Sequence, residues 1–273
     1  MIDLVGKIGS MALIDAKNGD IDYNKFAALG KQLKPGMVWI SSGAVEIGRL
    51  DFFKRAGAGL TGCVEENKTD YAAQGQAILM QTYRNFIDPK FSIRQILVEH
   101  SHFNDDEKRA HIEGLIKRAA AQGAIPIINY NDAVSSEENR KFEIDALRKK
   151  NVNAHELVDN DETAAQIACL VKAKTLLILS TLDGIYADIK DPKSLIREIS
   201  GKSTDEVHKK IDVLKMNCKG ASRAGAGGAA AKLEYIKPCL ARGTRVIIAC
   251  AAYGIDDVLA GRVPSTAIFC TDN

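Results

Sequence analysis

Short apolar runs along the chain alternate with longer stretches in which apolar residues recur every three or four positions. The runs have the composition of buried strands and lie at residues 2–5, 37–40, 92–98, 124–128, 175–179, 243–250 and 267–269. The stretches with helical spacing lie at residues 22–33, 46–55, 71–86, 105–121, 203–214 and 233–242. Strands that alternate with helices of ten or more residues predict an α/β fold with an open, mostly parallel sheet sandwiched by helices. We expect the run at 267–269 to be an edge strand.

Two polar stretches interrupt this alternation. Residues 57–70 are rich in glycine and have no clear period, which predicts a loop beside a site. Residues 135–154 are strongly charged and predict an exposed hairpin or a helical excursion. A lid is one role for this second stretch, and a solvated insertion is the simpler one.

The turn after the strand at 37–40 has the composition of an anion site. Its residues are Ser41, Ser42, Gly43 and Ala44, and a helical pattern follows them. Such a junction leaves unpaired backbone N–H groups at the start of a helix, where they suit an anion. An ordinary junction with a serine N-cap has the same composition.

Two lysines lie in glycine-rich surroundings. Lys7 stands between Gly6 and Gly9, and Lys232 ends the glycine- and alanine-rich stretch 220–232. Bare backbone beside a lysine suits a phosphate group. For Lys7 the alternative is an ordinary solvated lysine, and for the stretch 220–232 it is a flexible linker. We expect both turns to be exposed.

Polar turns follow later strands as well. Residues 129–132 (Asn-Tyr-Asn-Asp) follow one strand, and residues 180–183 (Ser-Thr-Leu-Asp) follow another. An open α/β sheet builds its site past the carboxyl ends of its strands, although Asn and Asp also satisfy turns unaided. Asp161 opens a helix that runs through Val171, where capping alone explains a carboxylate. The number of such turns favours a phosphorylated ligand.

Composition narrows the classes of partner. The chain has 273 residues, of which 46% are hydrophobic, and a formal net charge of +2, which indicates neither nucleic acid nor a membrane surface. No window reaches the ~18 apolar residues of a membrane span, and the N-terminus has the pattern of a strand, not of a signal peptide. The cysteines lack Cys-x-x-Cys spacing, which favours free thiols, mostly buried, in a reducing cytoplasm.

A series of short motifs, in order along nearly the whole chain, resembles the amino acid kinase superfamily and most closely its glutamate 5-kinase family. The motifs lie at residues 6–10, 41–45, 73–76, 126–134, 159–161, 183–186 and 225–232. The chain departs from the family at several positions. Tyr130 stands where the family usually has Glu, the pair 180–181 replaces Thr-Asp, Ala226 replaces Thr, and the segment 135–158 is longer.

The resemblance implies a carbamate-kinase-like fold with a single kinase domain over residues 1–273. The acceptor would lie on the N-terminal half, about 1–165, and the nucleotide on the C-terminal half, about 166–273. We expect no small C-terminal RNA-modification-type domain of the kind that many glutamate 5-kinases carry. We also expect a homo-oligomer, because the helix at 71–86 has more apolar surface than one sheet face needs.

The activity implied is ATP-dependent phosphorylation of the side-chain carboxylate of L-glutamate to glutamyl 5-phosphate, the first step of proline biosynthesis. Lys7 and Lys232 would be the catalytic cations and Asp161 would orient both, with the N–H groups of Gly9 and Gly43 completing the clamp. The acceptor residues would be Ser42, Gly43, Ala44, Asp132 and Asn160. The nucleotide residues would be Lys7, Gly9, Ser180, Thr181, Asp183, Tyr186, Gly225, Ala226, Gly227, Gly228 and Lys232.

Mg²⁺ would bridge the ATP phosphates through their oxygens and water, with no dedicated protein metal site. One alternative is a kinase of another small carboxylate, phosphonate or phosphate. Another is a non-catalytic amino-acid or nucleotide sensor, which the presence of Lys7, Lys232 and Asp161 disfavours. An isoprenoid acceptor is disfavoured because no apolar cluster borders residues 129–132 in the sequence.

Overall fold

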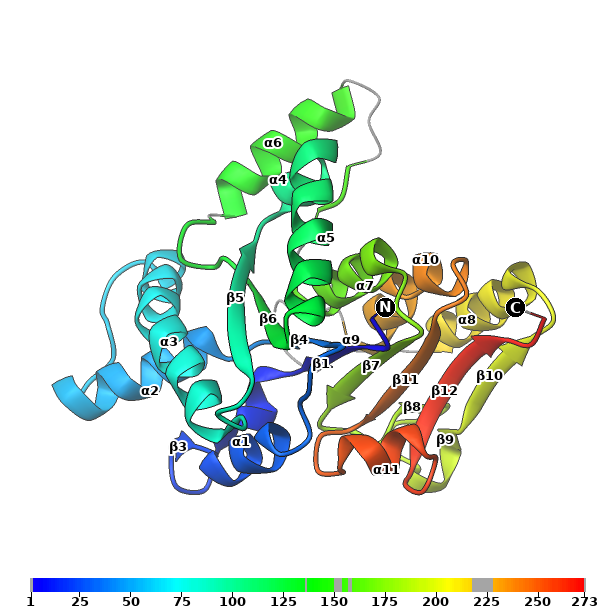
Figure 1. Cartoon of the computed structure of the whole chain (residues 1–273), viewed down its shortest axis with the longest axis horizontal. Helices are drawn as coiled ribbons and strands as arrows, with labels where there is room; N and C mark the ends of the chain where they lie inside the picture. Colours follow the sequence, from blue (N-terminus) through cyan, green and yellow to red (C-terminus); the bar gives the residue numbers. More distant parts are fainter. Residues whose placement is uncertain (1, 136, 150–153, 157–158, 218–227, 273) are drawn as a thin grey trace.

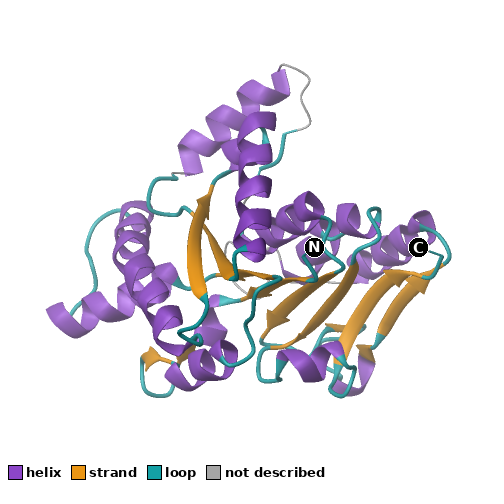
Figure 2. Cartoon of the chain, in the orientation of Figure 1, coloured by secondary structure: helices purple, strands orange, loops and turns teal. Residues whose placement is uncertain are grey.

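An eight-stranded sheet forms the middle layer of the chain, and helices cover both of its faces (Figure 1 and Figure 2). The computed structural model describes residues 2–135, 137–149, 154–156, 159–217 and 228–272. The sheet order is β10-β12-β11-β7-β1-β4-β6-β5. Its strands are β1 (Leu4–Ile8), β4 (Met37–Ser41), β5 (Ser92–Val98), β6 (Ala124–Tyr130), β7 (Thr175–Ser180), β10 (Glu198–Gly201), β11 (Arg245–Cys250) and β12 (Ser265–Cys270).

The predicted α/β fold is confirmed, with one correction at the sheet edge. All neighbouring strands pair in parallel except β11 and β12, which are antiparallel. The expectation that 267–269 forms an edge strand is wrong, because β10 pairs with the outer side of β12. The hydrophobic pattern does not predict β10, because its four residues, Glu-Ile-Ser-Gly, include only one large apolar side chain.

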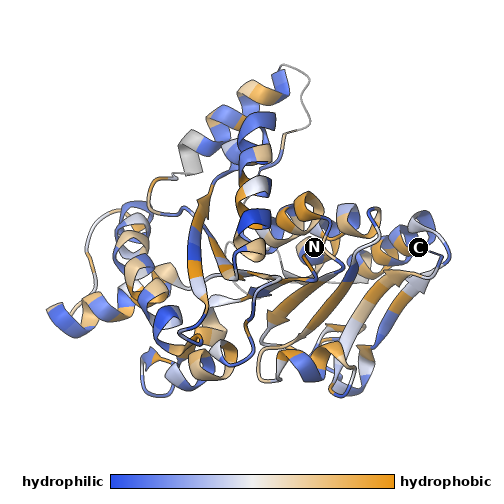
Figure 3. Cartoon of the chain, in the orientation of Figure 1, coloured by the Kyte–Doolittle hydropathy of each residue, from blue (hydrophilic) through white to orange (hydrophobic). Residues whose placement is uncertain are grey.

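Alternate residues of the central strands build two cores, one on each face of the sheet. Val5, Val38 and Leu176 belong to one core, whereas Leu4, Trp39 and Leu177 belong to the other. A parallel strand that is covered on both faces has no polar side to alternate with, which explains its continuous apolar sequence. Figure 3 shows these strands as mostly hydrophobic and helix α6 as mostly hydrophilic.

The helices divide between the two cores. The first core is covered by α5 (Asp106–Ala121), α7 (Asn160–Val171), α8 (Thr204–Asn217), α9 (Gly228–Tyr235) and α10 (Lys237–Leu240). The second is covered by α1 (Tyr23–Gly30), α2 (Ala44–Ala56), α3 (Val64–Phe86) and α11 (Ile255–Leu259). The short helix α4 (His100–Phe103) and helix α6 (Glu137–Lys149) lie together beyond one end of the sheet (Figure 1).

Short elements complete the described chain. They are the hairpin pairs β2 (Ile14–Asp15) with β3 (Asp20–Ile21) and β8 (Ile185–Tyr186) with β9 (Leu195–Ile196), and the 3₁₀ turns Ser10–Leu13 and Pro192–Ser194. None of the described helices is long and apolar enough to cross a membrane.

Two helices differ from the sequence prediction, and a third is as predicted. The predicted loop at 57–70 is partly wrong, because α3 starts at Val64, where Glu65 and Glu66 favour the positive end of the helix dipole. The single helix expected at 233–242 is two helices, since Pro238 cannot donate a backbone hydrogen bond and lies in the first turn of α10. The charged stretch after Ser135 forms helix α6, so the helical excursion is confirmed.

The apolar face of α3 is used inside the chain. Leu79 and Tyr83 are fully buried in the second core, and Val64 is the only large apolar side chain of this fully described helix that is strongly exposed. The argument for a homo-oligomer from surplus apolar surface on this helix is therefore wrong, and association itself stays a prediction.

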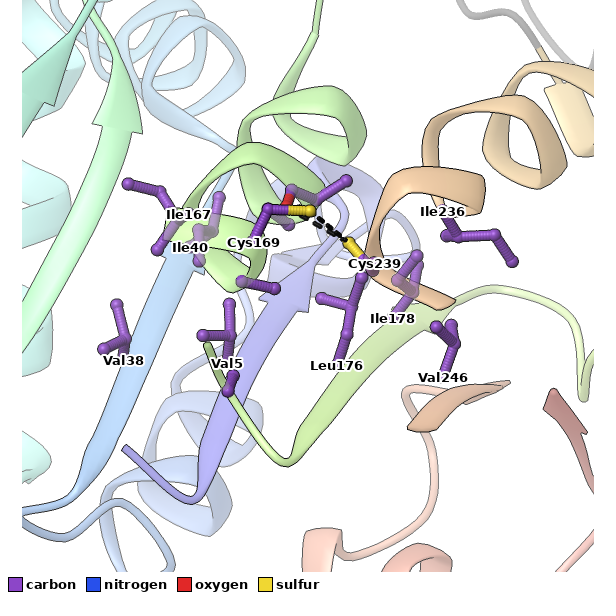
Figure 4. Packing of buried hydrophobic residues seen from close by; sticks show 14 of the residues in the cluster. Val5, Val38, Ile40, Ile167, Cys169, Leu176, Ile178, Ile236, Cys239 and Val246 are labelled. Atoms are coloured by element: carbon purple, nitrogen blue, oxygen red, sulfur yellow. Dashed lines mark hydrogen bonds between the residues drawn. The ribbon is translucent and has the colours of Figure 1, made fainter. Parts of the chain in front are cut away.

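Two of the five described cysteines lie in the first core and touch each other. Cys169 of α7 and Cys239 of α10 are free thiols with their sulfur atoms 3.2 Å apart (Figure 4). Cys63 is exposed, Cys250 and Cys270 are half-buried, and Cys218 lies outside the described residues. The expectation of free thiols is confirmed for these five, but the expectation that most are buried is wrong.

Candidate active site

Lys7 lies within strand β1 and points toward helix α7. It is only 7% exposed, so the exposed turn expected from the sequence is wrong. Residues two apart on a strand share a face, so Lys7 lies on the side of Val5, which belongs to the α7 core. Gly6 has a packing role, because a Cβ there would lie 2.2 Å from a ring carbon of Trp39.

Helix α7 is capped by Asp159, which leaves Asp161 for another role. The Asp159 carboxylate accepts hydrogen bonds from the backbone N–H groups of Asp161, at 2.8 Å, and of Glu162, at 3.0 Å. Burial and the nearby charge of Asp161 raise the pKa of Asp159. Capping as the explanation of Asp161 is therefore wrong, since the cap lies two residues earlier.

Two lysines from opposite ends of the chain meet on Asp161. Lys7 Nζ lies 2.6 Å from Asp161 Oδ1, and Lys232 Nζ lies 2.8 Å from Oδ2. Burial raises the pKa of the Asp161 carboxyl, but the charges of both lysines outweigh it and hold that pKa below its ordinary value. The two ammonium groups share one carboxylate, which suits them to hold an anion between them.

A second polar cluster adjoins the first through Asn160, the neighbour of Asp161. Asn129 of β6 donates to Gln76 of α3 at 2.8 Å and accepts from Asn160 at 2.9 Å. Asn160 in turn accepts from the backbone N–H of Tyr130 at 3.2 Å. This chain of amides ties three elements together and fixes the Asn160 side chain.

A cavity of about 370 Å³ lies beside this cluster, between α3, the start of α2 and the ends of β5 and β6. Most of its wall is small and apolar, formed by Ala44, Ala72, Ala73, Ala77, Leu97, Tyr130 and Ala133. Its polar residues are Gln76, Gln95, Asn131 and Asp132. The expectation that no apolar cluster borders residues 129–132 is wrong, because the apolar wall comes from helices and strands distant in sequence.

Asp132 lies in this cavity with little compensation for its charge. Burial raises the pKa of its carboxyl, and the positive charges of Lys68 and Arg140 only partly oppose that shift. Lys68 Nζ lies 4.0 Å away, at the limit of an ion pair. A partly buried carboxylate in a cavity suits a cationic group of a ligand.

The turn after β4 has part of the geometry expected of it. Gly43 has φ of 114°, which favours glycine, and no side chain caps helix α2, so the serine cap is wrong. The N–H of the half-buried Ser42 donates to Ile8 O at 3.2 Å. Gly9 adjoins the Lys7 ammonium, and its N–H donates to Leu179 O at 3.3 Å, so this N–H already has a partner within the sheet.

The expected nucleotide residues of β7 gather at its carboxyl end. The Ser180 hydroxyl closes the turn by bonding the backbone of Leu182, and Thr181 is exposed. Tyr186 donates to Asp183 Oδ2 at 3.2 Å. Gly228 has φ of 61° and starts α9, whereas Gly225, Ala226 and Gly227 lie outside the described residues.

Tyr235 is a neighbour of the site that the sequence reasoning missed. Burial, together with the nearby carboxylates of Asp159, Glu162 and Asp161, raises the pKa of its hydroxyl. Its spacing of three residues from Lys232 on a helix was the available signal, because residues three apart share a face.

A protein-family model described as the amino acid kinase family matches residues 4–250. Glutamate 5-kinase 1 of Bacillus licheniformis is 31% identical over 254 residues, which cover 90% of this chain but only 62% of the relative. Glutamate 5-kinase of Symbiobacterium thermophilum is 28% identical over 253 residues, which cover 89% of this chain and 86% of the relative.

Solved structures share the fold at low sequence identity. Carbamate kinase from Giardia lamblia, bound to AMP-PNP, superposes with a TM-score of 0.61 at 16% identity and covers 98% of each chain. UMP kinase from Bacillus anthracis superposes with a TM-score of 0.58 at 12% identity, covering 100% of this chain and 96% of its own. From the matched sequence and the shared fold together, we conclude that the chain belongs to the amino acid kinase family.

Proposed function

We propose that the chain transfers the γ-phosphoryl group of ATP to the side-chain carboxylate of L-glutamate, giving glutamyl 5-phosphate for proline biosynthesis. The observation that supports this most is the convergence of Lys7 and Lys232 on Asp161. A buried carboxylate that holds two ammonium groups side by side orders them before any ligand binds, and such order favours electrostatic catalysis.

The chemistry demands neutralisation of charge more than proton transfer. A carboxylate acceptor is already ionised at neutral pH, so no general base is needed. The enzyme must bring two anions together and stabilise charge on the transferring phosphoryl group. Lys7 and Lys232 would contact that group from its two sides, while Asp161 keeps both ammonium groups aimed at it.

The nucleotide would occupy the C-terminal half of a single domain, near Ser180, Thr181, Asp183 and Tyr186 and the start of α9. Mg²⁺ bound to the ATP phosphates would supply further neutralisation of charge. Among the described residues, no cluster of three or more His, Cys, Asp or Glu side chains is arranged to hold a metal. Both oxygens of Asp161 already contact lysines, so the metal would be held by phosphate and water.

The acceptor would occupy the cavity next to Asn160, in the N-terminal half. Ser42, Gly43 and Ala44 would border its reacting carboxylate, and Asp132 would hold its ammonium group. The incompletely compensated charge of Asp132 supports an acceptor with a cationic group. It disfavours a bare phosphate, which the same carboxylate would repel.

A second candidate is a kinase whose acceptor carries an aliphatic chain. The alanines of the cavity wall favour it, because small side chains leave space that glutamate does not fill. Trapping of an acyl phosphate with hydroxylamine, with ADP release measured in parallel, tests both. We expect a trapped hydroxamate from glutamate; ADP release with another acceptor only would contradict the glutamate proposal.

The sensor alternative has its own outcome in the same experiment. Wild-type protein and the Lys232→Met variant should be compared at equal concentration, because the substitution preserves the length of the side chain and removes one proposed catalytic cation. ADP release that is absent from both proteins with every acceptor would contradict an enzyme and support a sensor.

A further inference from the structure

Two free thiols lie in contact inside the first core, close to the helices of the candidate active site. Cys169 near the C-terminal end of α7 and Cys239 of α10 have their sulfur atoms 3.2 Å apart, and Figure 4 shows the two sulfurs turned toward each other. Among the described cysteines, no other pair makes such a contact. A single buried thiol acts as a small apolar side chain, but two sulfurs that face each other across two helices can also bond to each other.

The two thiols differ in reactivity. Cys169 is 6% exposed, whereas Cys239 is fully buried. The hydrogen bond with Cys239 lowers the pKa of the Cys169 thiol; burial opposes this shift and the charge of Arg242 supports it. Arg242 Nη1 donates to the backbone oxygen of Cys169 at 2.8 Å, which holds that charge near the thiol. Since the thiolate is the reactive form, Cys169 is the sulfur that reacts first.

We propose that Cys169 and Cys239 are a redox-sensitive pair, which hydrogen peroxide or a similarly small peroxide oxidises to a disulfide that links α7 to α10 and slows phosphoryl transfer. The Cys169 thiolate attacks one peroxide oxygen, the O–O bond breaks, and the displaced hydroxide takes up the thiol proton and leaves as water. The product at Cys169 is a sulfenic acid.

The second step joins the two sulfurs. Cys239 Sγ attacks Cys169 Sγ, the S–S bond forms and the S–O bond breaks. The displaced hydroxide takes the proton of Cys239 and leaves as a second water. The two sulfurs together lose two electrons, and the peroxide gains them.

The burial of the pair decides which oxidant fits. Exchange with a disulfide such as oxidised glutathione requires a bulky partner in line with the attacked sulfur, and a residue that is 6% exposed leaves no room for one. A peroxide is little larger than water and needs no such access. In a reducing compartment the pair therefore stays reduced until a peroxide appears.

A bond between these sulfurs would act on the ion pair of Asp161 and Lys232. Asp161 lies in the first turn of α7, and Lys232 lies on α9, which a single residue separates from α10. The sulfurs must approach by about 1.2 Å to reach the ~2.05 Å of a disulfide, so α7 and α10 must shift relative to each other. A misplacement of ~1 Å at catalytic groups costs ~100-fold in rate. Because the sulfurs lie about 12 Å from Asp161 along α7, we expect a smaller loss of turnover, ~10-fold.

Oxidation of the wild-type protein with hydrogen peroxide tests the pair directly. After the remaining thiols are blocked with N-ethylmaleimide, trypsin releases Cys169 within residues 151–172 and Cys239 within residues 233–242, since the lysine–proline bond at 237–238 resists cleavage. We expect mass spectrometry to find these two peptides joined, with two hydrogen atoms fewer than the separate peptides together, and dithiothreitol to separate them. If the peptides are not joined, the proposal is wrong.

Turnover is compared in three variants, each with a single cysteine replaced. ADP release by the wild-type protein with glutamate should fall ~10-fold on oxidation and recover with dithiothreitol. Cys169→Ala and Cys239→Ala should each keep their turnover under the same treatment, whereas Cys63→Ala, which removes an exposed thiol outside the pair, should lose it like the wild type. Circular dichroism checks that the two core variants fold, and either one alone is sufficient. An equal loss of turnover in a folded core variant, or a disulfide without a loss in the wild type, would overturn the link to catalysis.

The two readouts also separate this inference from the proposed function. The effect on turnover rests on the proposed function, whereas the joined peptides form whatever the chain phosphorylates. Joined peptides in a protein that gives no acyl phosphate from glutamate would support the redox pair and refute the glutamate proposal. Acyl phosphate from a protein whose peptides never join would refute the redox pair alone.

Discussion

We predict that substitutions of Lys7, Asp161 and Lys232 lower the stability of the protein by different amounts but lower its turnover to a similar extent. The relevant changes are Asp161→Asn, which removes the shared carboxylate, and Lys7→Met or Lys232→Met, which remove one ammonium group each. All three substitutions nearly preserve the size of the side chain, so packing changes little and charge is the variable.

The magnitude follows from which charges each change leaves without a partner. Breaking a buried ion pair by removing one partner costs about 3–5 kcal/mol, because the remaining charge stays buried. Asp161→Asn leaves two ammonium groups facing each other, although the 18% exposure of the Lys232 side chain places the cost near the lower figure, about 3 kcal/mol. After Lys7→Met, Asp161 still pairs with Lys232, and we expect a cost of about 1 kcal/mol.

Thermal unfolding and ADP release measure the two effects separately. For a chain of this length, 1 kcal/mol corresponds to about 2–4 °C in Tm, so Asp161→Asn should lower Tm by about 6–12 °C and each lysine variant by about 3 °C. All three variants should lose more than about a hundredfold in turnover. Equal losses of Tm in the three variants would refute the argument that Asp161→Asn costs more because it leaves two ammonium groups without a partner. Wild-type turnover in a lysine variant would remove that lysine from the mechanism.

Three further predictions concern the cavity and its supports. Because the pKa of Asp132 is raised, its carboxylate becomes protonated at a higher pH than usual. The KM for glutamate, measured from initial rates between pH 5 and 8, should therefore rise as the pH falls. Asp132→Asn should remove this dependence on pH. Gly75→Ala should lower stability by about 3 kcal/mol, because its Cβ would lie 1.8 Å from Ala44 O, whereas Gly114→Ala meets only the end of a flexible arginine and should be neutral or slightly stabilising in the same melts. Gln76→Leu breaks the amide chain and should raise the glutamate KM by ~10-fold with an unchanged KM for ATP; an equal rise in both would show a general loss of structure.

The parts of the fold that the sequence predicts are those with strong local signals. Continuous apolar runs such as 175–179 indicate strands that are covered on both faces, and the structure confirms them. The order of the strands has no such local signal, since β1 and β7 pair through contacts between residues far apart in the sequence. β10 was missed for a related reason: it is too short and too polar to show a pattern before its partner is known.

The residues of the candidate site also differ in how far the sequence could identify them. The resemblance to a family brought Lys7, Asp161 and Lys232 together, whereas spacing alone left each with a simpler explanation. Local chemistry indicated that the bare backbone beside Lys7 suits a phosphate, but at Gly6 that backbone makes room for the Trp39 ring of the neighbouring strand. The alanines of the cavity gave no signal, because small apolar residues on a helix are common and only their convergence makes a wall.

The central position of β1 has a consequence for how the chain folds during synthesis. β1 leaves the ribosome before β4 and β7. It can pair with β4 as soon as that strand emerges, but its other edge stays unpaired until β7 is made, since residue 4 pairs with residue 175. Contacts between residues so far apart form slowly, and an unpaired apolar edge invites association with other chains. A nascent chain that stalls before β7 should therefore be prone to aggregation, and the ammonium pair of the site can assemble only when α9 has emerged.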